Sequence, residues 1–170
     1  MEEEEVLRYR DVIRQRAERI PLQHITGEQE FMGLPFAVNE HVLIPRQDTE
    51  VLVEEALKRL EQGKVPKEKE TVRMLDLCTG SGCILISILY YAAKRKNTDT
   101  GNRCRYSEAA LRIAEENLDL LEETGNKSMA ELLESDLFEQ VDGTFGMIVS
   151  NPPYIKNLCD QRTPGGSQAA

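Results

Sequence analysis

The sequence contains no tryptophan, and aromatic residues make up only 5% of its 170 residues. It has two histidines and four cysteines, and no two cysteines form a C-x-x-C pair. This scarcity argues against a metal site and favours reduced thiols, as in cytosolic proteins. No apolar run is long enough to span a membrane, and the acidic start at residues 2–5 does not resemble a signal peptide. We therefore expect a cytoplasmic protein that binds no metal.

The chain also lacks an excess of positive charge. The chain carries 30 acidic and 21 basic residues, for a net charge of -9. Binding to free nucleic acid depends on Lys and Arg placed against phosphates, so direct nucleic-acid binding is not expected. A protein partner and a small cationic ligand are both compatible with this charge. The length suits a single domain with a real core, which we expect to be a monomer.

The most informative motif is Asn151-Pro152-Pro153-Tyr154. It follows the apolar run 145–150, which predicts a buried strand. The first proline keeps Asn151 out of the helical region, and each proline fixes its own φ. The motif therefore presets an amide side chain, backbone carbonyls and an aromatic ring, which together can hold a planar –NH2 group by its hydrogens. Taken alone, the motif could instead be a proline-rich strand exit without function.

A second motif lies upstream, where the apolar strand 72–77 runs into the turn Cys78-Thr79-Gly80-Ser81-Gly82 and then into an apolar helix. Glycines in such a turn permit left-handed backbone and let a ligand approach closely. The N–H groups at the helix start can hold a carboxylate or phosphate. A glycine-rich turn alone is a weak signal, because many turns need glycine only for packing. Its occurrence together with Asn-Pro-Pro-Tyr is a strong signal.

Together the two motifs resemble the class I methyltransferases that use S-adenosylmethionine and methylate amide or amino nitrogens. Three more segments, 21–27, 30–31 and 43–50, resemble the release-factor glutamine N5-methyltransferases, the PrmC/HemK family. That family usually reads Pro-Arg-Pro-Asp-Thr-Glu in the last segment, so Gln47 is a mild departure.

The resemblance covers roughly residues 20–93 and 107–156. It implies an α/β fold with a Rossmann-like doubly wound sheet and S-adenosylmethionine as cofactor. The implied substrate is the glutamine of the Gly-Gly-Gln motif in peptide chain release factors. Its side-chain amide nitrogen would attack the sulfonium methyl group in an in-line displacement.

The resemblance also implies the site residues. An amide nitrogen is a weak nucleophile, so we expect acceptors on both of its hydrogens, namely the Asn151 side chain and the Pro152 carbonyl. Tyr154 would pack beside the target as the third catalytic residue, and Pro153 would complete the substrate-binding segment. No general base is identifiable. The expected cofactor-binding residues are Asp76, Cys78, Thr79, Gly80, Ser81, Gly82, Asp136, Leu137 and Asn151.

Four parts are expected along the chain. They are a remnant of an N-terminal helical domain at 1–20, a β-hairpin linker at 21–45, an incomplete methyltransferase domain at 46–156 and a disordered or out-of-frame tail at 157–170.

Local patterns add detail to these parts. They predict a helix over 6–20, a hairpin turn at Gly33-Leu34-Pro35, and a helix capped by Asp48 or Thr49.

The segment 94–106 departs most from the family pattern. A doubly wound fold needs its second strand here, ending in an acid that bonds the ribose hydroxyls. No four consecutive residues are apolar, so the strand pattern is lost, and alignment places Arg105 at the position of the acid. Two accounts stay open: Arg105 is genuine, with Asp99 reaching in from a loop, or the segment is translated out of frame.

Three functions also stay open. The first is a release-factor glutamine methyltransferase, and the second is a relative that methylates another amide or adenine. The third is a non-catalytic fragment, favoured by the altered second strand and by the absence of the family's C-terminal strands. In that case the strand ending at Ser150 would be an exposed edge, so we expect reduced stability and weak cofactor binding.

Overall fold

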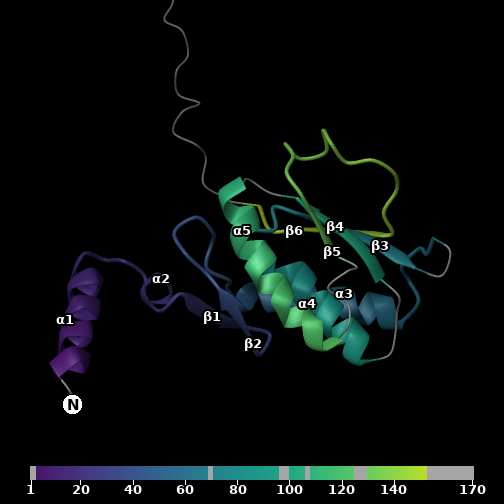
Figure 1. Cartoon of the computed structure of the whole chain (residues 1–170). Helices are drawn as coiled ribbons and strands as arrows, with labels where there is room; N and C mark the ends of the chain where they lie inside the picture. Colours follow the sequence, from purple (N-terminus) through teal and green to yellow (C-terminus); the bar gives the residue numbers. More distant parts are fainter. Residues whose placement is uncertain (1–2, 69–70, 96–99, 106–107, 125–129, 153–170) are drawn as a thin grey trace, which may run out of the picture.

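The computed structural model describes residues 3–68, 71–95, 100–105, 108–124 and 130–152. Its main body is an α/β unit around a parallel sheet of four strands in the order β5-β4-β3-β6 (Figure 1). The strands are β3 (Val72–Leu77), β4 (Thr100–Arg105), β5 (Ala130–Leu133) and β6 (Met147–Ser150). The parallel sheet and its strand order agree with the doubly wound α/β fold expected from the sequence.

The strand order reverses between β3 and β6. From β3 the chain moves outward to β4 and then β5, and it returns to add β6 on the other side of β3. The last residues of the two inner strands, Leu77 and Ser150, are partners in the register. Ligands of doubly wound sheets bind at such a switch point, outside the carboxyl ends of the strands.

The strand β4 corrects the expectation that the second strand is lost. Its main chain pairs with β3 from Val72↔Thr100 to Asp76↔Cys104 and with β5 up to Arg105↔Leu133. The pairing of β4 with its two neighbours uses backbone N–H and C=O groups, which every such residue supplies. A strand can therefore form in the middle of a sheet without an apolar run.

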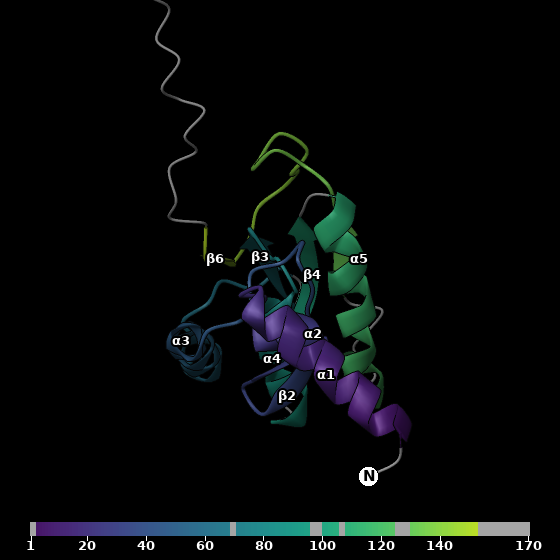
Figure 2. The same cartoon turned by 90° about the vertical axis from the view of Figure 1, so that its left-hand side faces the viewer.

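Three helices pack beside one another along the sheet. They are α3 (Glu50–Glu61), α4 (Cys83–Lys94) and α5 (Glu108–Asn117), followed by the 3-10 turn η2 (Leu118–Thr124). Figure 2 shows α4 between the other two, and it contacts both. This position explains why eight of the residues of α4 are buried, since a helix that is apolar on nearly all sides needs cover on nearly all sides.

A two-stranded hairpin precedes this body. It consists of β1 (Glu28–Phe31) and β2 (Leu34–Ala37), paired antiparallel. The turn is Met32-Gly33, with φ of 53° and 71°, so the expected turn at 33–35 is wrong by one residue. Two successive residues with positive φ make the tight turn that matches the twist of a hairpin, and this leaves Leu34 and Pro35 to begin β2.

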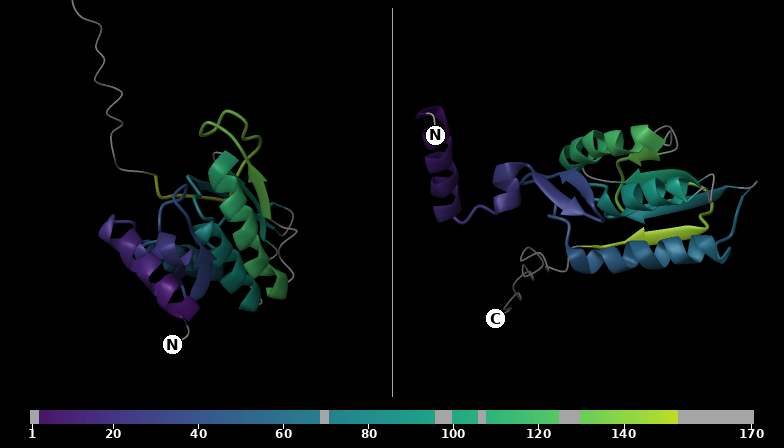
Figure 3. Two further views of the ribbon diagram at one scale, coloured as in Figure 1. Left: turned by 60° about the vertical axis from the view of Figure 1, so that its left-hand side comes forward. Right: turned by 90° about the horizontal axis from the view of Figure 1, so that it is seen from below.

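The N-terminal segment forms α1 (Glu3–Ala17) and the short α2 (Leu22–Thr26). The predicted helix over 6–20 is therefore present but shifted toward the N-terminus. None of the residues of α1 is buried, and Figures 1 and 3 show the helix standing away from the α/β body. Leu7, Tyr9 and Ile13 remain at least half exposed on it.

Candidate functional site

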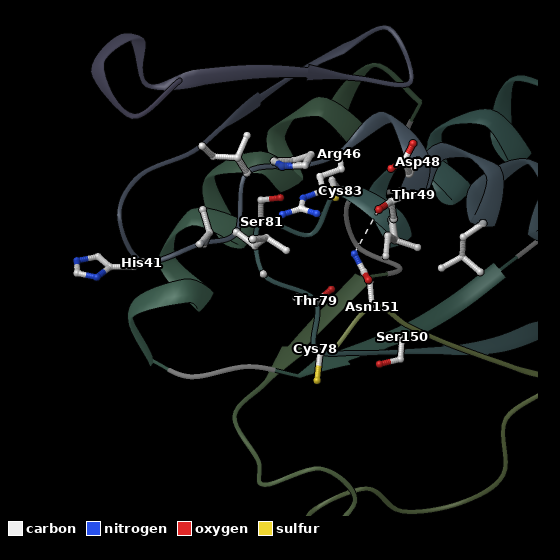
Figure 4. A pocket seen from close by; sticks show the side chains of 17 residues that line it. His41, Arg46, Asp48, Thr49, Cys78, Thr79, Ser81, Cys83, Ser150 and Asn151 are labelled. Atoms are coloured by element: carbon white, nitrogen blue, oxygen red, sulfur yellow. Dashed lines mark hydrogen bonds between the residues drawn. The ribbon is translucent and has the colours of Figure 1, made fainter. Parts of the chain in front are cut away.

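A cavity of about 720 Å³ opens at the carboxyl ends of β3 and β6 (Figure 4). Three separate segments line it: 41–52 before and within α3, 78–84 after β3, and 150–151 at the end of β6. Cys78, Thr79, Gly80, Ser81 and Asn151, all predicted site residues, meet there. The cavity therefore joins the two motifs that were singled out in the sequence.

The two glycines of the turn serve different purposes. Both have left-handed backbone, with φ of 56° at Gly80 and 80° at Gly82. A Cβ on Gly82 would lie 2.7 Å from Cδ1 of the buried Ile86 in α4, so a larger residue there would force that side chain to shift. A Cβ on Gly80 would meet nothing within 4 Å. Gly80 therefore keeps an open face where a ligand can approach the backbone.

Cys78 begins the turn in a conformation that side chains seldom adopt. Its φ is 63°, although it is not glycine. Left-handed backbone costs a residue with a Cβ about 1–2 kcal/mol. The thiol is half-buried and unpaired with any other described cysteine, and it lines the cavity. The sequence motif indicated that Cys78 belongs to the site, but not that its backbone is strained.

Asp76 lies beneath the turn, fully buried, and accepts a hydrogen bond from Thr79 Oγ1 at 2.5 Å. Burial raises the pKa of Asp76 to about 7, against the hydrogen bond from Thr79 and the Leu85 amide, which both lower it. Asp76 is not one of the described residues that line the cavity. It therefore supports the turn from the buried side. Cys83, next to the turn, is also buried, and burial raises the pKa of its thiol to about 12.

Asn117 ties the hairpin to the turn, and the sequence analysis missed it. Its side chain is buried at the end of α5. Oδ1 accepts from the amide of Ala37 at 2.7 Å, while Nδ2 donates to the carbonyls of Ala37 at 3.0 Å and Ser81 at 2.8 Å. The signal was available, because Ala110, Ala114 and Asn117 share the buried face of one helix, where an amide needs partners.

Asn151 lies at the end of β6, and its Nδ2 donates to Thr49 Oγ1 at 3.2 Å (Figure 4). The prediction that the side chain of Asp48 or Thr49 caps α3 is wrong. Thr49 occupies the N-cap position but makes no capping hydrogen bond. Its own φ and ψ are helical, because the 3-10 turn η1 (Gln47–Thr49) leads directly into α3, and the hydroxyl accepts from Asn151 instead.

The other predicted site residues are more scattered. Pro152 is exposed beyond Asn151, and Asp136 and Leu137 follow β5, with Leu137 56% exposed. Pro152, Asp136, Leu137 and Gly82 are all absent from the described residues that line the cavity. Pro153, Tyr154, Asp99 and the tail 157–170 lie outside the residues that the structure describes. The roles predicted for all of these residues stay predictions.

The described part of the chain offers neither a cluster of metal ligands nor a membrane-spanning helix. No group of three or more His, Cys, Asp or Glu residues there is placed to hold a metal ion. Within the same residues, no helix combines the length and the apolar character that crossing a membrane requires.

Comparison with known proteins defines the class of protein. The family model of the methyltransferase small domain matches residues 49–163, which is most of the chain and includes both motifs. The chain therefore belongs to the methyltransferase small domain family, and the class I methyltransferase fold expected from the sequence is confirmed. S-adenosylmethionine, the cofactor expected from the sequence, is the methyl donor that this class implies.

The chain is also similar to one particular family of methyltransferases. The PrmC N-terminal domain model matches residues 1–27. The chain is 40% identical over 136 residues to the release factor glutamine methyltransferase of Borreliella burgdorferi, covering 80% of this chain and 43% of that protein. It is 42% identical over 149 residues to that of Moorella thermoacetica, covering 87% and 48%. The resemblance to the PrmC/HemK family is confirmed, and the chain spans about half the length of these relatives.

Similarity to solved structures is weaker. The human methyltransferase 10 domain containing protein is 16% identical, with a TM-score of 0.46, and the match covers 86% of this chain and 64% of that one.

Proposed function

We propose that this chain belongs to an enzyme that transfers a methyl group from S-adenosylmethionine to a glutamine side chain. The target is the glutamine of the Gly-Gly-Gln motif in a peptide chain release factor. The single observation that carries the proposal is the meeting of the two motifs in one cavity. Because Leu77 and Ser150 are register partners at the switch point of the sheet, the glycine-rich turn and Asn151 face the same space.

The residues of the cavity fit the cofactor. Gly80 leaves the backbone of the turn open, and α4 begins at the turn with a glycine, Gly82, at its N-cap position. The volume of about 720 Å³ lies within the usual range of sites for ligands of this size. S-adenosylmethionine, when bound, supplies a methyl group on a positively charged sulfur. The turn 78–82 would hold it, as predicted from the sequence.

Asn151 and Pro152 would orient the acceptor. An amide nitrogen is a weak nucleophile because its lone pair is delocalised into the carbonyl group. Hydrogen bonds from its two hydrogens to the Asn151 side chain and the Pro152 carbonyl would hold it in place. Such orientation is worth up to roughly 7–11 kcal/mol in favourable cases. Thr49 supports this arrangement, since its hydrogen bond restrains the amide plane of Asn151. Pro153 and Tyr154 complete the proposed substrate segment.

The remaining assignments extend the proposal along the chain. Residues 1–27 would belong to an N-terminal helical domain that helps bind the release factor, which fits the match of that segment to the PrmC N-terminal domain. The exposed apolar side chains of α1 are consistent with such a role. Asp136 and Leu137 are proposed to flank the adenine of the cofactor.

The test is transfer of labelled methyl groups to an intact release factor. The same factor with its Gly-Gly-Gln glutamine changed to alanine is the control substrate. We expect label only in the unaltered factor, and Asn151→Ala should lower the transfer rate much more than cofactor affinity. Label that persists in the altered factor would contradict the proposed substrate and favour another amide as the target.

A further inference from the structure

We infer that Glu50 is a positioning residue for methyl transfer, because it fixes the start of α3, where Thr49 holds Asn151. The inference rests on the proposed function and concerns a residue that is not one of the described residues lining the cavity. Two observations support it. The side chain of Glu50 binds the turn of the hairpin, and the residue before it in the chain binds Asn151.

The hairpin turn presents its main-chain groups to two helices. Met32 has left-handed backbone with a φ of 53°, and a two-residue turn leaves main-chain groups that the strand pairing does not use. The N–H of Met32 donates to Oε1 of Glu50 at 2.7 Å, and its carbonyl accepts from the hydroxyl of Tyr91 at 2.5 Å. The turn is therefore held by α3 and by α4.

The hairpin is a firm anchor for the side chain of Glu50. Phe31 and Phe36, on the two strands of the hairpin, are 1% and 0% exposed, and Met32 packs against the same core. Glu50 is itself half-buried. A carboxylate that accepts from a backbone N–H makes a stronger hydrogen bond than a neutral acceptor does. The bond to Met32 therefore restrains the first residue of α3.

The start of α3 has few restraints of its own. Neither η1 nor α3 has a side-chain cap. The turn η1 that leads into α3 spans only three residues, and 3-10 hydrogen bonds have poorer geometry than those of an α-helix. Because Glu50 directly follows Thr49, its bond to the hairpin fixes the backbone that carries the Thr49 side chain.

Thr49 passes this restraint to the site. Its Oγ1 accepts from Nδ2 of Asn151 at 3.2 Å, and Figure 4 shows the two side chains pointing toward each other. An N–H···O bond of this length is near the upper end of the usual range, so a small shift of Thr49 would break it. Without the anchor at Glu50, the amide of Asn151 would lose its fixed plane.

The experiment is a double-mutant cycle, measured as kcat for methyl transfer from S-adenosylmethionine to a release factor. The cycle combines Glu50→Ala with Thr49→Val, which removes the acceptor of the Asn151 bond. Glu50→Gln keeps an oxygen that can accept from Met32, so it tests for rescue. Glu54→Ala is the matched control, because Glu54 is an exposed glutamate of the same helix.

We expect Glu50→Ala to lower kcat by about two- to fivefold when Thr49 is present, since it weakens one hydrogen bond indirectly. In the Thr49→Val background it should have no further effect, because residues that act through one bond are not additive. Glu50→Gln should recover most of the lost rate, and Glu54→Ala should leave kcat unchanged. The affinity of Glu50→Ala for S-adenosylhomocysteine should also stay unchanged.

Two kinetic results would overturn the inference: an equal fall of kcat in both backgrounds, or no fall in either. A thermal unfolding scan shows whether each variant is folded. If Glu50→Ala is not, Glu50→Leu takes its place in the cycle, because leucine fills much of the space of the glutamate side chain without supplying an acceptor.

A second measurement separates this inference from the proposed function, whose failure would appear as no methyl transfer by the unaltered chain. Nuclear magnetic resonance of the isotope-labelled chain reports the side-chain amide of Asn151, identified by the loss of its signal in Asn151→Ala. We expect this signal to shift in Glu50→Ala as it does in Thr49→Val, and to keep its position in Glu54→Ala. A signal that Glu50→Ala leaves in place would overturn the inference, whether or not the chain transfers methyl groups.

Discussion

Asn151 donates a hydrogen bond from Nδ2 to Thr49 Oγ1 over 3.2 Å, which joins residues 102 positions apart in the chain. The bond links the end of β6 to the start of α3 across the cavity. With its nitrogen held by Thr49, the amide of Asn151 has a fixed plane. A fixed plane matters for a side chain proposed to orient another amide, because misplacement of such a group by a fraction of an ångström weakens both hydrogen bonds and catalysis.

This contact gives the first prediction, for Thr49→Val and Thr49→Ser. Valine has nearly the shape of threonine but cannot accept the hydrogen bond, whereas serine retains the hydroxyl. We expect Thr49→Val to lower the rate of methyl transfer to a release factor by about five- to tenfold, as loss of roughly 1 kcal/mol would. Thr49→Ser should stay close to the unaltered chain. Equal rates for the valine and serine variants would show that the hydroxyl does not position Asn151.

The strained backbone of Cys78 gives the second prediction. Glycine adopts a φ of 63° without the penalty that a Cβ imposes, although it also gains freedom in the unfolded chain. The net expectation for Cys78→Gly is an increase of about 0.5–1 kcal/mol in the free energy of unfolding, measured with urea. Cys78→Ala removes the thiol but keeps the Cβ, so it should not stabilise. A gain in the alanine variant as large as in the glycine variant would assign the effect to the thiol.

Asn117 gives the third prediction. Asn117→Asp keeps the oxygen that accepts from Ala37 but replaces the nitrogen that donates to Ala37 and Ser81. Two buried carbonyls would then face a carboxylate, so we expect a loss of about 2–4 kcal/mol in the free energy of unfolding. Asn39→Asp is the matched control, because within the described part of the chain Asn39 uses only its oxygen, which accepts from the amide of His41 at 3.0 Å. Similar losses at both positions would contradict the role given to Asn117.

Asp76 gives a prediction about pH. Burial raises the pKa of Asp76 from 3.8 to about 7, so between these values the folded chain binds a proton that the unfolded chain has released. Stability should therefore fall as the pH rises from about 4 to 7 and then level off, by at most about 4 kcal/mol for a shift of this size. Asp76→Asn cannot ionise and should remove this part of the pH dependence. Identical pH profiles for the two proteins in urea unfolding would refute the assignment.

The sequence predicted the parts of the site that depend on local pattern. The apolar strand, the turn 78–82 and the following helix are consecutive in the chain, so periodicity and glycine placement identified them together. Asn151 was placed correctly at the end of a strand for the same reason. The strand β4 was missed because it is stabilised by main-chain pairing on both sides, which leaves no apolar signature in 100–105.

Contacts between distant segments account for the remaining differences. Thr49 looked like a helix cap because its neighbours in sequence suggest one, but its hydroxyl bonds to a residue far along the chain. Asn117 acquires its partners only when α5, the hairpin and the turn after β3 come together. Local sequence propensities carry no information on such contacts, which only the three-dimensional structure reveals.

The most direct test of the whole account is calorimetric binding of S-adenosylmethionine to the unaltered chain, Gly80→Val and Gly63→Val. Both glycines have left-handed backbone, with φ of 56° and 63°, and a Cβ on either would meet nothing within 4 Å. The two valines therefore impose a similar strain, but only Gly80 lines the cavity. The account predicts binding by the unaltered chain and by Gly63→Val, and a loss of binding in Gly80→Val. Equal binding by all three proteins would contradict the placement of the cofactor in this cavity.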